Sequence, residues 1–291
     1  MDLIRELVPF FQLFPGVYLA SLFILGLCIG SFLNVVIYRL PLMIQREWRQ
    51  DCLEFLEQPG APDAESFNLL VPRSRCGHCG RQISATENIP ILSYLILRGK
   101  CAGCGTSISI QYPLVEIFAA LVSLIVGWHF GVSLQALAAL VFSWSLIAAS
   151  GIDIGHKILP DSITLPLMWL GILLSLFNVF IDIQSSIIGA MGGYLSLWSI
   201  FILFKLVTGK EGMGHGDFKL LAMLGAWTGW KMLFVIILTS SLVGAIVGIT
   251  MIVLKKTERG TQIPFGPYLA AAGWLSLLWG AEISQFYFKL L

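Results

Sequence analysis

Charged residues are scarce in this chain. Asp, Glu, Lys and Arg together make up 12% of its 291 residues, about half of the usual share of roughly 25%. So little polar surface cannot cover the apolar mass of a water-soluble globule, which excludes a soluble Rossmann, barrel or sandwich fold. Hydrophobic residues make up 57% of the chain, with 29 Gly and 9 Trp, and this composition is typical of a protein that lies mostly in lipid.

Several short enzyme motifs are also missing. A P-loop would indicate nucleotide binding, H-E-x-x-H a zinc protease and G-x-S-x-G a serine hydrolase. The sequence contains none of these three motifs. The basic residues are spread along loops that flank hydrophobic segments, whereas nucleic-acid binding needs a basic face on a soluble fold. We therefore expect membrane lipid, and not nucleic acid, around this protein.

Long hydrophobic runs dominate what is present. A membrane-spanning helix needs about 20 mostly apolar residues, and this length predicts an all-α polytopic membrane protein with about eight transmembrane helices. The sixth segment is short, so we expect it to be tilted, broken or only partly inserted. The first has no small-residue cleavage site and is interpreted as a retained anchor. The eight segments are 17–38, 112–130, 133–151, 162–182, 185–207, 217–230, 231–254 and 265–287.

The positions of Lys and Arg predict the orientation, because cytoplasmic loops carry the excess of these residues. If the N-terminus lies outside, 15 of the 18 basic residues fall in cytoplasmic loops, and only Arg5, Lys231 and Lys289 do not. We therefore expect a multi-pass protein with both termini outside. Its cytoplasmic loops would be 39–111, 152–161, 205–219 and 255–261.

The first of these loops contains two cysteine pairs. After a polar stretch over 45–57 that we expect to be a helix, Cys76 and Cys79 form one C-x2-C motif and Cys101 and Cys104 form another. This spacing is typical of a tetrahedral site with four thiolate ligands, in which zinc is structural because no position is left for water. The sequence therefore predicts a small cytoplasmic zinc-binding domain.

Two disulfides are the alternative for these four cysteines. A reducing cytoplasm makes stable disulfides rare, so metal binding is favoured. His78 is a further candidate ligand, although four cysteines already complete a tetrahedron. Cys28 and Cys52 have no partner at this spacing and are interpreted as packing residues.

Acidic residues near the hydrocarbon are costly and point to function. The candidates are Glu116, Asp153, Asp217 and Glu282. Asp153 closes the third segment and Asp217 opens the sixth, so both lie at cytoplasmic helix ends in the predicted topology. Two facing carboxylates share one proton and form an acid–base device. Helix capping is the alternative role for Asp217, a turn is the alternative for Asp153, and Asp161 is interpreted first as a helix cap.

The sequence resembles the bacterial type IV prepilin peptidases. The resemblance rests on residues 30–41 (GSFLNVVIYRLP), the two cysteine pairs, the Asp153 segment and Gly214-His215-Gly216-Asp217, which follow one another in one order along nearly the whole chain. The last motif is similar to the G-x-G-D signature of presenilin-like intramembrane aspartyl proteases. The resemblance implies that Asp153 and Asp217 are the two catalytic aspartates.

The resemblance also implies an activity. Members of this family remove a short positively charged leader from prepilins and from type II secretion pseudopilins at the cytoplasmic face of the bacterial inner membrane. They cut after a Gly and before a hydrophobic stretch. Many members also methylate the new N-terminal residue with S-adenosylmethionine. The residues themselves identify no methyl-donor site, and residues 30–111 are a hypothesis for its location.

The predicted domain organisation follows from these features. Residues 1–38 form the N-terminal segment and first transmembrane helix, 39–111 the cytoplasmic domain with the four-cysteine zinc site, and 112–291 the membrane-embedded aspartyl protease domain. A polytopic transporter or assembly scaffold with a structural zinc domain is the alternative function, although the internal repeat that transporters often show is not evident. A methyltransferase without protease activity is a third possibility.

Overall fold

The computed structural model describes residues 2–58, 67–84, 86–210, 212–254 and 263–290. These residues form ten α-helices and one short 3-10 helix, and no β-strand lies within these ranges. Five of the helices are long and apolar enough to cross a membrane. The all-α, multi-pass fold predicted from the sequence is therefore confirmed. The chain divides into two compact units, Met1–Ala148 and Ala149–Leu291, which are described separately.

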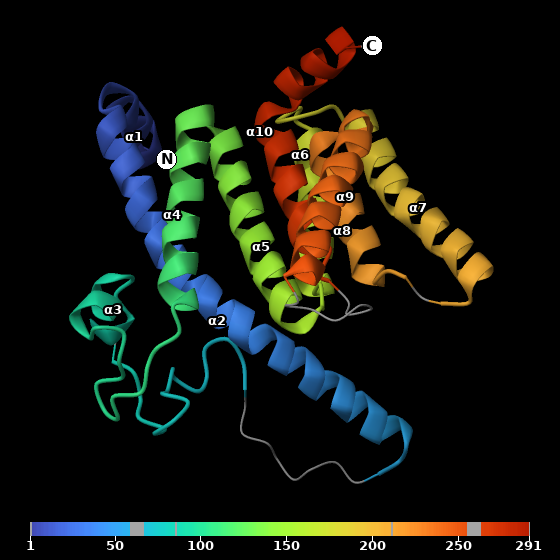
Figure 1. Ribbon diagram of the computed structural model, residues 1–291. Coiled ribbons are helices and arrows are strands. Elements are labelled where there is room, and N and C mark those ends of the chain that lie inside the picture. The colour runs from blue at the N-terminus through green and yellow to red at the C-terminus, as the bar shows by residue number, and fades with distance from the viewer. Residues whose placement is uncertain (1, 59–66, 85, 211, 255–262, 291) are drawn as a thin grey trace. The chain divides into compact units, whose positions relative to one another are not determined.

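The first unit is built around one long helix. Gly26 and Gly30 let this helix and a partner approach closely, because a Cβ at either position would lie 2.6 Å from a backbone Cα of Ala120 or Glu116. Small residues at such contacts are typical of helix packing in membranes. The elements are α1 (Asp2–Leu13), the long helix α2 (Pro15–Phe55), η1 (Thr86–Asn88), α3 (Leu92–Ile96), the partner helix α4 (Gln111–Phe130) and the first part of α5 (Leu134–His156) (Figure 1).

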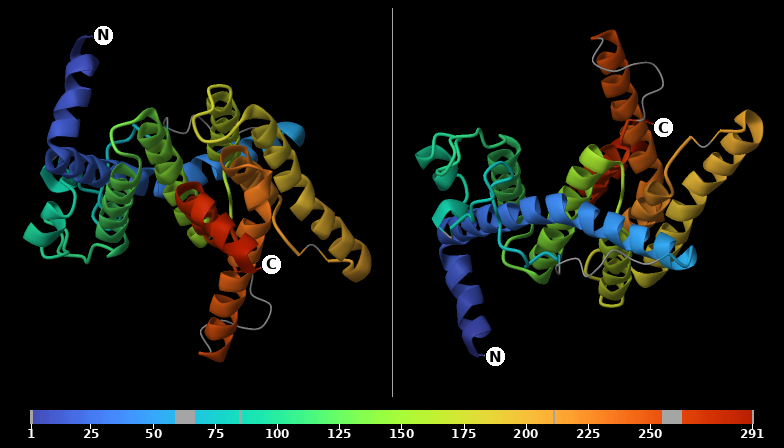
Figure 2. Two further views of the ribbon diagram at one scale, coloured as in Figure 1. Left: turned by 90° about the horizontal axis from the view of Figure 1, so that it is seen from above. Right: turned by 90° about the horizontal axis from the view of Figure 1, so that it is seen from below.

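Helix α2 corrects one boundary of the sequence prediction. The polar helix expected over 45–57 is not a separate element, because α2 runs unbroken to Phe55 and includes Pro41 (Figure 2). Proline removes one backbone hydrogen bond, but transmembrane helices tolerate such a loss. The residues that follow include Gln, Arg and Glu, which are strong helix formers, so the helix continues past the apolar segment.

In the second unit, four helices surround a short central one. The central helix α8 contacts α6, α7, α9 and α10 (Figure 1), and nearly every residue from Asp217 to Trp227 is buried. A helix that is buried all round is part of a core. The elements are α6 (Asp161–Ser175), α7 (Ile183–Thr208), α8 (His215–Thr228), α9 (Trp230–Val253) and α10 (Gly266–Leu290).

The short length of α8 agrees with the expectation for the sixth segment. Its 14 residues span roughly 21 Å at about 1.5 Å per residue, less than the hydrocarbon thickness of about 30 Å.

The packing of α8 against α7 depends on glycine. A Cβ at Gly189 would lie 2.2 Å from the carbonyl oxygen of Gly225, and a Cβ at Gly193 would lie 2.5 Å from that of Leu221.

Two predicted segments end differently in the structure. The fourth was expected to run to residue 182, but α6 ends at Ser175. Asn178, in the connection after α6, has a left-handed φ of 52°. The Asp182 carboxylate accepts a hydrogen bond from the Ser185 amide at 2.9 Å, so Asp182 caps the start of a new helix, α7. The last segment is kinked at Trp279. The predicted loop 255–261 lies outside the described residues.

Candidate active site

Asp153 lies in the last turn of α5 and is nearly buried, with 5% of its surface exposed. Its Oδ2 accepts the backbone N–H of Gly266 at 3.0 Å. Gly266 is the first residue of α10, and the first amides of a helix have no partner inside the helix. The Asp153 carboxylate therefore satisfies a free amide at the start of α10, and this fixes its position.

Asp217 lies in the first turn of α8 and is 8% exposed. Gly214 is the N-cap of this helix, and its backbone amide hydrogen-bonds to the Asp217 carboxylate. A side chain that reaches back from the third helical position to the N-cap amide forms half of a capping box. Asp217 thus contributes to capping α8, which is the alternative role considered for it from the sequence, and the helix dipole favours a negative charge at this first-turn position.

The two carboxyl groups belong to the same compact unit and interact electrostatically. Leu159, in the loop after α5, lies against both backbone segments that hold them. A Cβ at Gly216 would lie 2.8 Å from Leu159 Cβ, and a Cβ at Gly266 would lie 3.1 Å from Leu159 Cδ2. The structure thus brings Asp153 and Asp217 together at the ends of three helices, with the aliphatic Leu159 beside them.

Sequence reasoning missed Gly266 and Leu159. The only signal for Gly266 is its position between Phe265 and Pro267, just before the last hydrophobic segment, where an N-terminal helix amide is to be expected. Nothing in the sequence distinguishes Leu159 from other aliphatic residues. Both residues support the carboxylates through geometry that only the fold reveals.

The other acidic candidates have different surroundings. The Asp161 carboxylate pairs with Lys219 Nζ at 2.6 Å, which links the first residue of α6 to α8. Glu116 lies in the first unit and accepts the Ile91 amide at 2.8 Å. Glu282 is exposed on α10. Asp161 and Glu282 therefore do not join the Asp153–Asp217 pair, and Glu116 belongs to the other unit.

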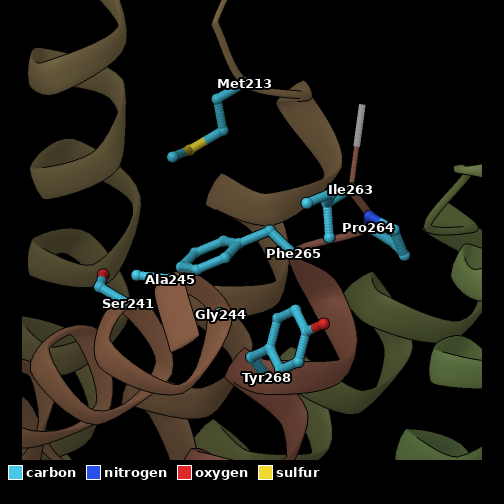
Figure 3. Close-up of a pocket in the computed structure, with 8 residues that line it drawn as sticks. All are labelled: Met213, Ser241, Gly244, Ala245, Ile263, Pro264, Phe265 and Tyr268. Carbon is cyan, nitrogen blue, oxygen red and sulfur yellow. The ribbon is translucent and has the colours of Figure 1, made fainter. Parts of the chain in front are cut away.

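A cavity of about 280 Å³ lies in the second unit and borders the segments that hold the carboxylates. Met213 immediately precedes Gly214, and Phe265 immediately precedes Gly266, and both side chains line the cavity together with residues of α9 (Figure 3). Most of the lining is apolar, and it contains no charged side chain. The cavity is lined by Met213, Ser241, Gly244, Ala245, Ile263, Pro264, Phe265 and Tyr268.

The four cysteines of the two C-x2-C motifs form a cluster in the first unit. Their Sγ atoms all lie within 4.8 Å of one another, and the Sγ atoms of Cys76 and Cys104 are 3.8 Å apart. A tetrahedral zinc ion with Zn–S bonds of about 2.3 Å requires sulfur atoms about 3.8 Å apart. The donor set and its spacing therefore fit a closed, four-thiolate zinc site.

The two motifs have the same backbone structure. The Cys76 amide donates to the Arg81 carbonyl and the Cys101 amide to the Thr106 carbonyl, both at 2.8 Å. Gly80 and Gly105 each close their turn with a φ of 70°, in the left-handed region that glycine adopts without strain. Each turn thus presents its two sulfur atoms in the same way, which explains how two short loops build one cluster.

Hydrogen bonds adjust the thiols of this cluster. Thr106 lowers the pKa of Cys104 to about 6, and the backbone amides of Cys79 and His78 lower the pKa of Cys76. The Arg81 amide also acts to lower the pKa of Cys79, but desolvation and the neighbouring thiols outweigh it and raise that pKa to about 11. Thiols packed this closely cannot all ionise easily without a cation, and this favours a bound metal.

Comparisons with known proteins identify the family of this chain. Residues 24–130 match the bacterial peptidase A24 N-terminal domain, and residues 140–249 match the type IV leader peptidase family. No solved structure matches the chain.

Relatives named prepilin leader peptidase/N-methyltransferase match nearly the whole chain. The protein from Stutzerimonas stutzeri is 55% identical over 97% of this chain and 98% of its own length. The protein from Pseudomonas aeruginosa is 52% identical over 94% of this chain and 95% of its own length. The protein from Dichelobacter nodosus is 52% identical over 94% of this chain and 94% of its own length. The chain therefore belongs to the type IV leader peptidase family.

Proposed function

We propose that this protein is a membrane aspartyl endopeptidase that removes the leader peptide from type IV prepilins and type II secretion pseudopilins. The family and the names of the relatives support prepilin processing and methylation. The observation that carries the catalytic assignment is the pair of nearly buried carboxylates, Asp153 and Asp217, held at helix ends within one compact unit.

The chemistry of such a pair suits peptide hydrolysis. Two adjacent carboxylates hold one proton between them. The ionised member takes a proton from a water molecule, whose oxygen attacks the scissile carbonyl carbon, while the protonated member donates to the carbonyl oxygen. When the tetrahedral intermediate collapses, the C–N bond breaks and the departing amine takes a proton from the pair.

The positions of the two residues support these roles. The amide of Gly266 holds the Asp153 carboxylate, and the amide of Gly214 holds that of Asp217, so neither has to reorganise before reaction. Helix N-termini favour negative charge, and α8 and α10 both begin at the pair. Such preorganised dipoles stabilise charge that develops in a transition state.

We also propose where the protein acts. Several of its helices suit a multi-pass membrane protein, and the Lys and Arg distribution favours a cytoplasmic face for both aspartates. The proposed location is the bacterial inner membrane, with the active site at the cytoplasmic side. A substrate whose apolar helix already lies in the bilayer would meet the pair there, and its helix can dock by small-residue packing.

The cysteine cluster is proposed to hold a structural zinc ion. Thiolates from Cys76, Cys79, Cys101 and Cys104 lie close enough together to complete a tetrahedron around the ion, which would leave no open position for water or substrate. A bound ion would fix the two turns to each other and order this part of the 39–111 domain. The three-domain division into 1–38, 39–111 and 112–291 is likewise proposed.

The methyl donor proposed for the second activity is S-adenosylmethionine. The cavity beside the aspartates does not fit this molecule, because its lining carries no charged side chain to pair with the amino-acid end of the donor. We therefore assign no residue to the donor and derive no step through it. Residues 30–111 remain the proposed region for its binding.

This function can be tested by mass spectrometry. A prepilin is incubated with the purified full-length protein in detergent, with and without S-adenosylmethionine, and the product masses are measured. We expect loss of the leader in both cases and one added methyl group only when the donor is present. An intact prepilin after incubation with folded, zinc-loaded protein would contradict the peptidase assignment. A cleaved but unmethylated product would contradict the second activity alone.

A further inference from the structure

The short helix α3 and the residue Ile89 before it expose a cluster of large apolar side chains. The residues Ile89, Leu92, Leu95 and Ile96 are all between 43% and 70% exposed. Side chains three and four residues apart share one face of a helix, so Leu92 lies on the same face as Leu95 and Ile96. We name these four residues the α3 face. Contiguous exposed apolar surface of this kind marks an interaction site.

The start of α3 is fixed to the two helices that form the core of the first unit. The backbone N–H of Ile91, the N-cap of α3, donates a 2.8 Å hydrogen bond to the Glu116 carboxylate of α4. The side chain of Ser31 on α2 also hydrogen-bonds to this carboxylate, and Glu116 is buried. A buried carboxylate between α2 and α4 therefore holds α3 beside the first turns of α4 (Figure 1).

Two exposed tyrosines indicate where these helices meet the membrane–water boundary. Tyr38 of α2 and Tyr112 of α4 lie near each other and are both exposed, and tyrosine is enriched at that boundary. Glu116 follows Tyr112 by four residues, which is about 6 Å further along α4 at about 1.5 Å per residue. The start of α3 is therefore level with the apolar segment of α4 and not with the aqueous side of Tyr112.

The charges near the α3 face are all positive. Arg98 and Lys100 follow α3 and are exposed, and no Asp or Glu occurs between residues 88 and 115. Basic side chains beside an apolar face are typical of segments that lie in the surface of an anionic membrane. Their long aliphatic stems reach the headgroups, and the charges attract anionic lipid.

We propose that the α3 face lies in the interfacial layer of the membrane that α2 and α4 span, with Arg98 and Lys100 on anionic lipid headgroups. This inference goes beyond the proposed function, because it requires no peptidase activity. Burial of the four apolar side chains at the boundary of the acyl chains is favourable. Cys101 directly follows Lys100, so the contact would also hold the second cysteine pair close to the membrane surface.

Photocrosslinking from single positions tests this contact. The full-length protein with p-benzoylphenylalanine in place of Leu95 is reconstituted in vesicles of phosphatidylglycerol and phosphatidylethanolamine, irradiated and analysed by mass spectrometry. The positive control has the same group at position 121, which is exposed on the membrane-spanning α4. The negative control has it at position 54, which is exposed where α2 is rich in charged residues. We expect at least about tenfold more lipid adduct at position 95 than at position 54, because burial of a side chain of this size contributes about 1.5–3 kcal/mol.

Two results would overturn the proposal. One is lipid adducts at position 121 together with a yield at position 95 no higher than at position 54. The other is adducts from position 95 to protein alone, since a second copy of the chain or another protein surface would then cover the α3 face. If the substitution at position 95 prevents folding, position 96 on the same face repeats the measurement, and there too we expect adducts to lipid.

Removal of the basic residues tests the preference for anionic lipid. In an Arg98→Ser and Lys100→Ser double variant, we expect the yield of phosphatidylglycerol adducts at position 95 to fall by at least about threefold, because each basic residue near an anionic surface contributes about fivefold in binding. The matched control is an Arg73→Ser and Arg75→Ser double variant, since both arginines are exposed in the same loop domain but lie outside α3. It should keep the parental yield. Equal yields from the two double variants would overturn the proposal.

Discussion

The amide of Gly266, the first residue of α10, donates a 3.0 Å hydrogen bond to Oδ2 of Asp153 in the last turn of α5. Asp217 has a corresponding bond to the Gly214 amide at the start of α8. Each carboxylate is thus held by a backbone amide at the beginning of a helix. The positive ends of α8 and α10 both favour the negative charge that the pair must carry.

Replacement of Gly266 by Ala should displace the Asp153 carboxylate. A Cβ at this position would lie 2.7 Å from Asp153 Oδ2, and a shift of about 1 Å at a reacting group can cost about a hundredfold in rate. We expect kcat for prepilin cleavage to fall by about 10–100-fold with a smaller change in KM. The control is Gly280→Ala on the same helix, where the new Cβ would meet only Met232, with its flexible Sδ at 3.2 Å. Equal kcat values for the two variants would refute this role of Gly266.

Loss of two ligands should release the proposed zinc ion. The purified parent should contain about one zinc per chain by elemental analysis, because four thiolates complete its coordination. A Cys76→Ser and Cys79→Ser double variant should lose most of it and become more susceptible to proteolysis within 39–111. Cys52→Ser is the matched control, since Cys52 is exposed on α2 and lies outside the cluster. Parent protein without zinc would disprove the site.

The glycine contact between α7 and α8 should be sensitive to a single methyl group. A Cβ at Gly189 would meet the carbonyl oxygen of Gly225 at 2.2 Å, so Gly189→Ala must push the helices apart. Overpacking of this kind costs about 1–3 kcal/mol. We expect a lower midpoint of thermal unfolding in detergent. The control is Gly192→Ala on the same helix, whose Cβ would meet only the end of the flexible Leu233 side chain at 3.1 Å, so it should lower the unfolding midpoint less. A larger decrease for Gly192→Ala than for Gly189→Ala would count against this packing.

The ion pair between Asp161 and Lys219 should contribute little to stability. Its side chains are 52% and 32% exposed, and exposed pairs contribute about 0.2–1 kcal/mol. We expect Lys219→Ala to change the unfolding midpoint only slightly. A double-mutant cycle with Asp161→Ala measures the interaction, and a coupling well above this range would show that the pair has a larger structural role than its exposure indicates.

The sequence predicted much of the fold because membrane helices are recognisable from local composition. A run of apolar residues must form a helix in lipid, where every backbone polar group needs an internal partner. The segments over 112–130 and 231–254 therefore match α4 and α9 closely. The ends of α2 and α6 could not be predicted in this way. The end of α2 depends on the helix continuing through Pro41, and the end of α6 depends on Asp182 starting a new helix.

The candidate site was only partly predictable. The cost of charge near hydrocarbon pointed to four acidic residues, and the family resemblance singled out Asp153 and Asp217 among them. The four cysteines were recognised because their spacing is specific. The contacts of Gly266 and Leu159 join segments more than 50 residues apart in the chain. Such contacts follow from helix packing and leave no local pattern, and the same holds for the cavity between Met213 and Phe265.

The central claim is that Asp153 and Asp217 act together in prepilin cleavage. The most direct test is the cleavage rate of the full-length parent and of the Asp153→Asn and Asp217→Asn variants, with leader loss read by mass spectrometry. The control is Asp182→Asn, because Asn also caps helices well and Asp182 caps α7 away from the pair. We predict that either active-site variant loses at least about a thousandfold in rate while the control cleaves like the parent. Substantial cleavage by a folded Asp153→Asn or Asp217→Asn protein would contradict the account.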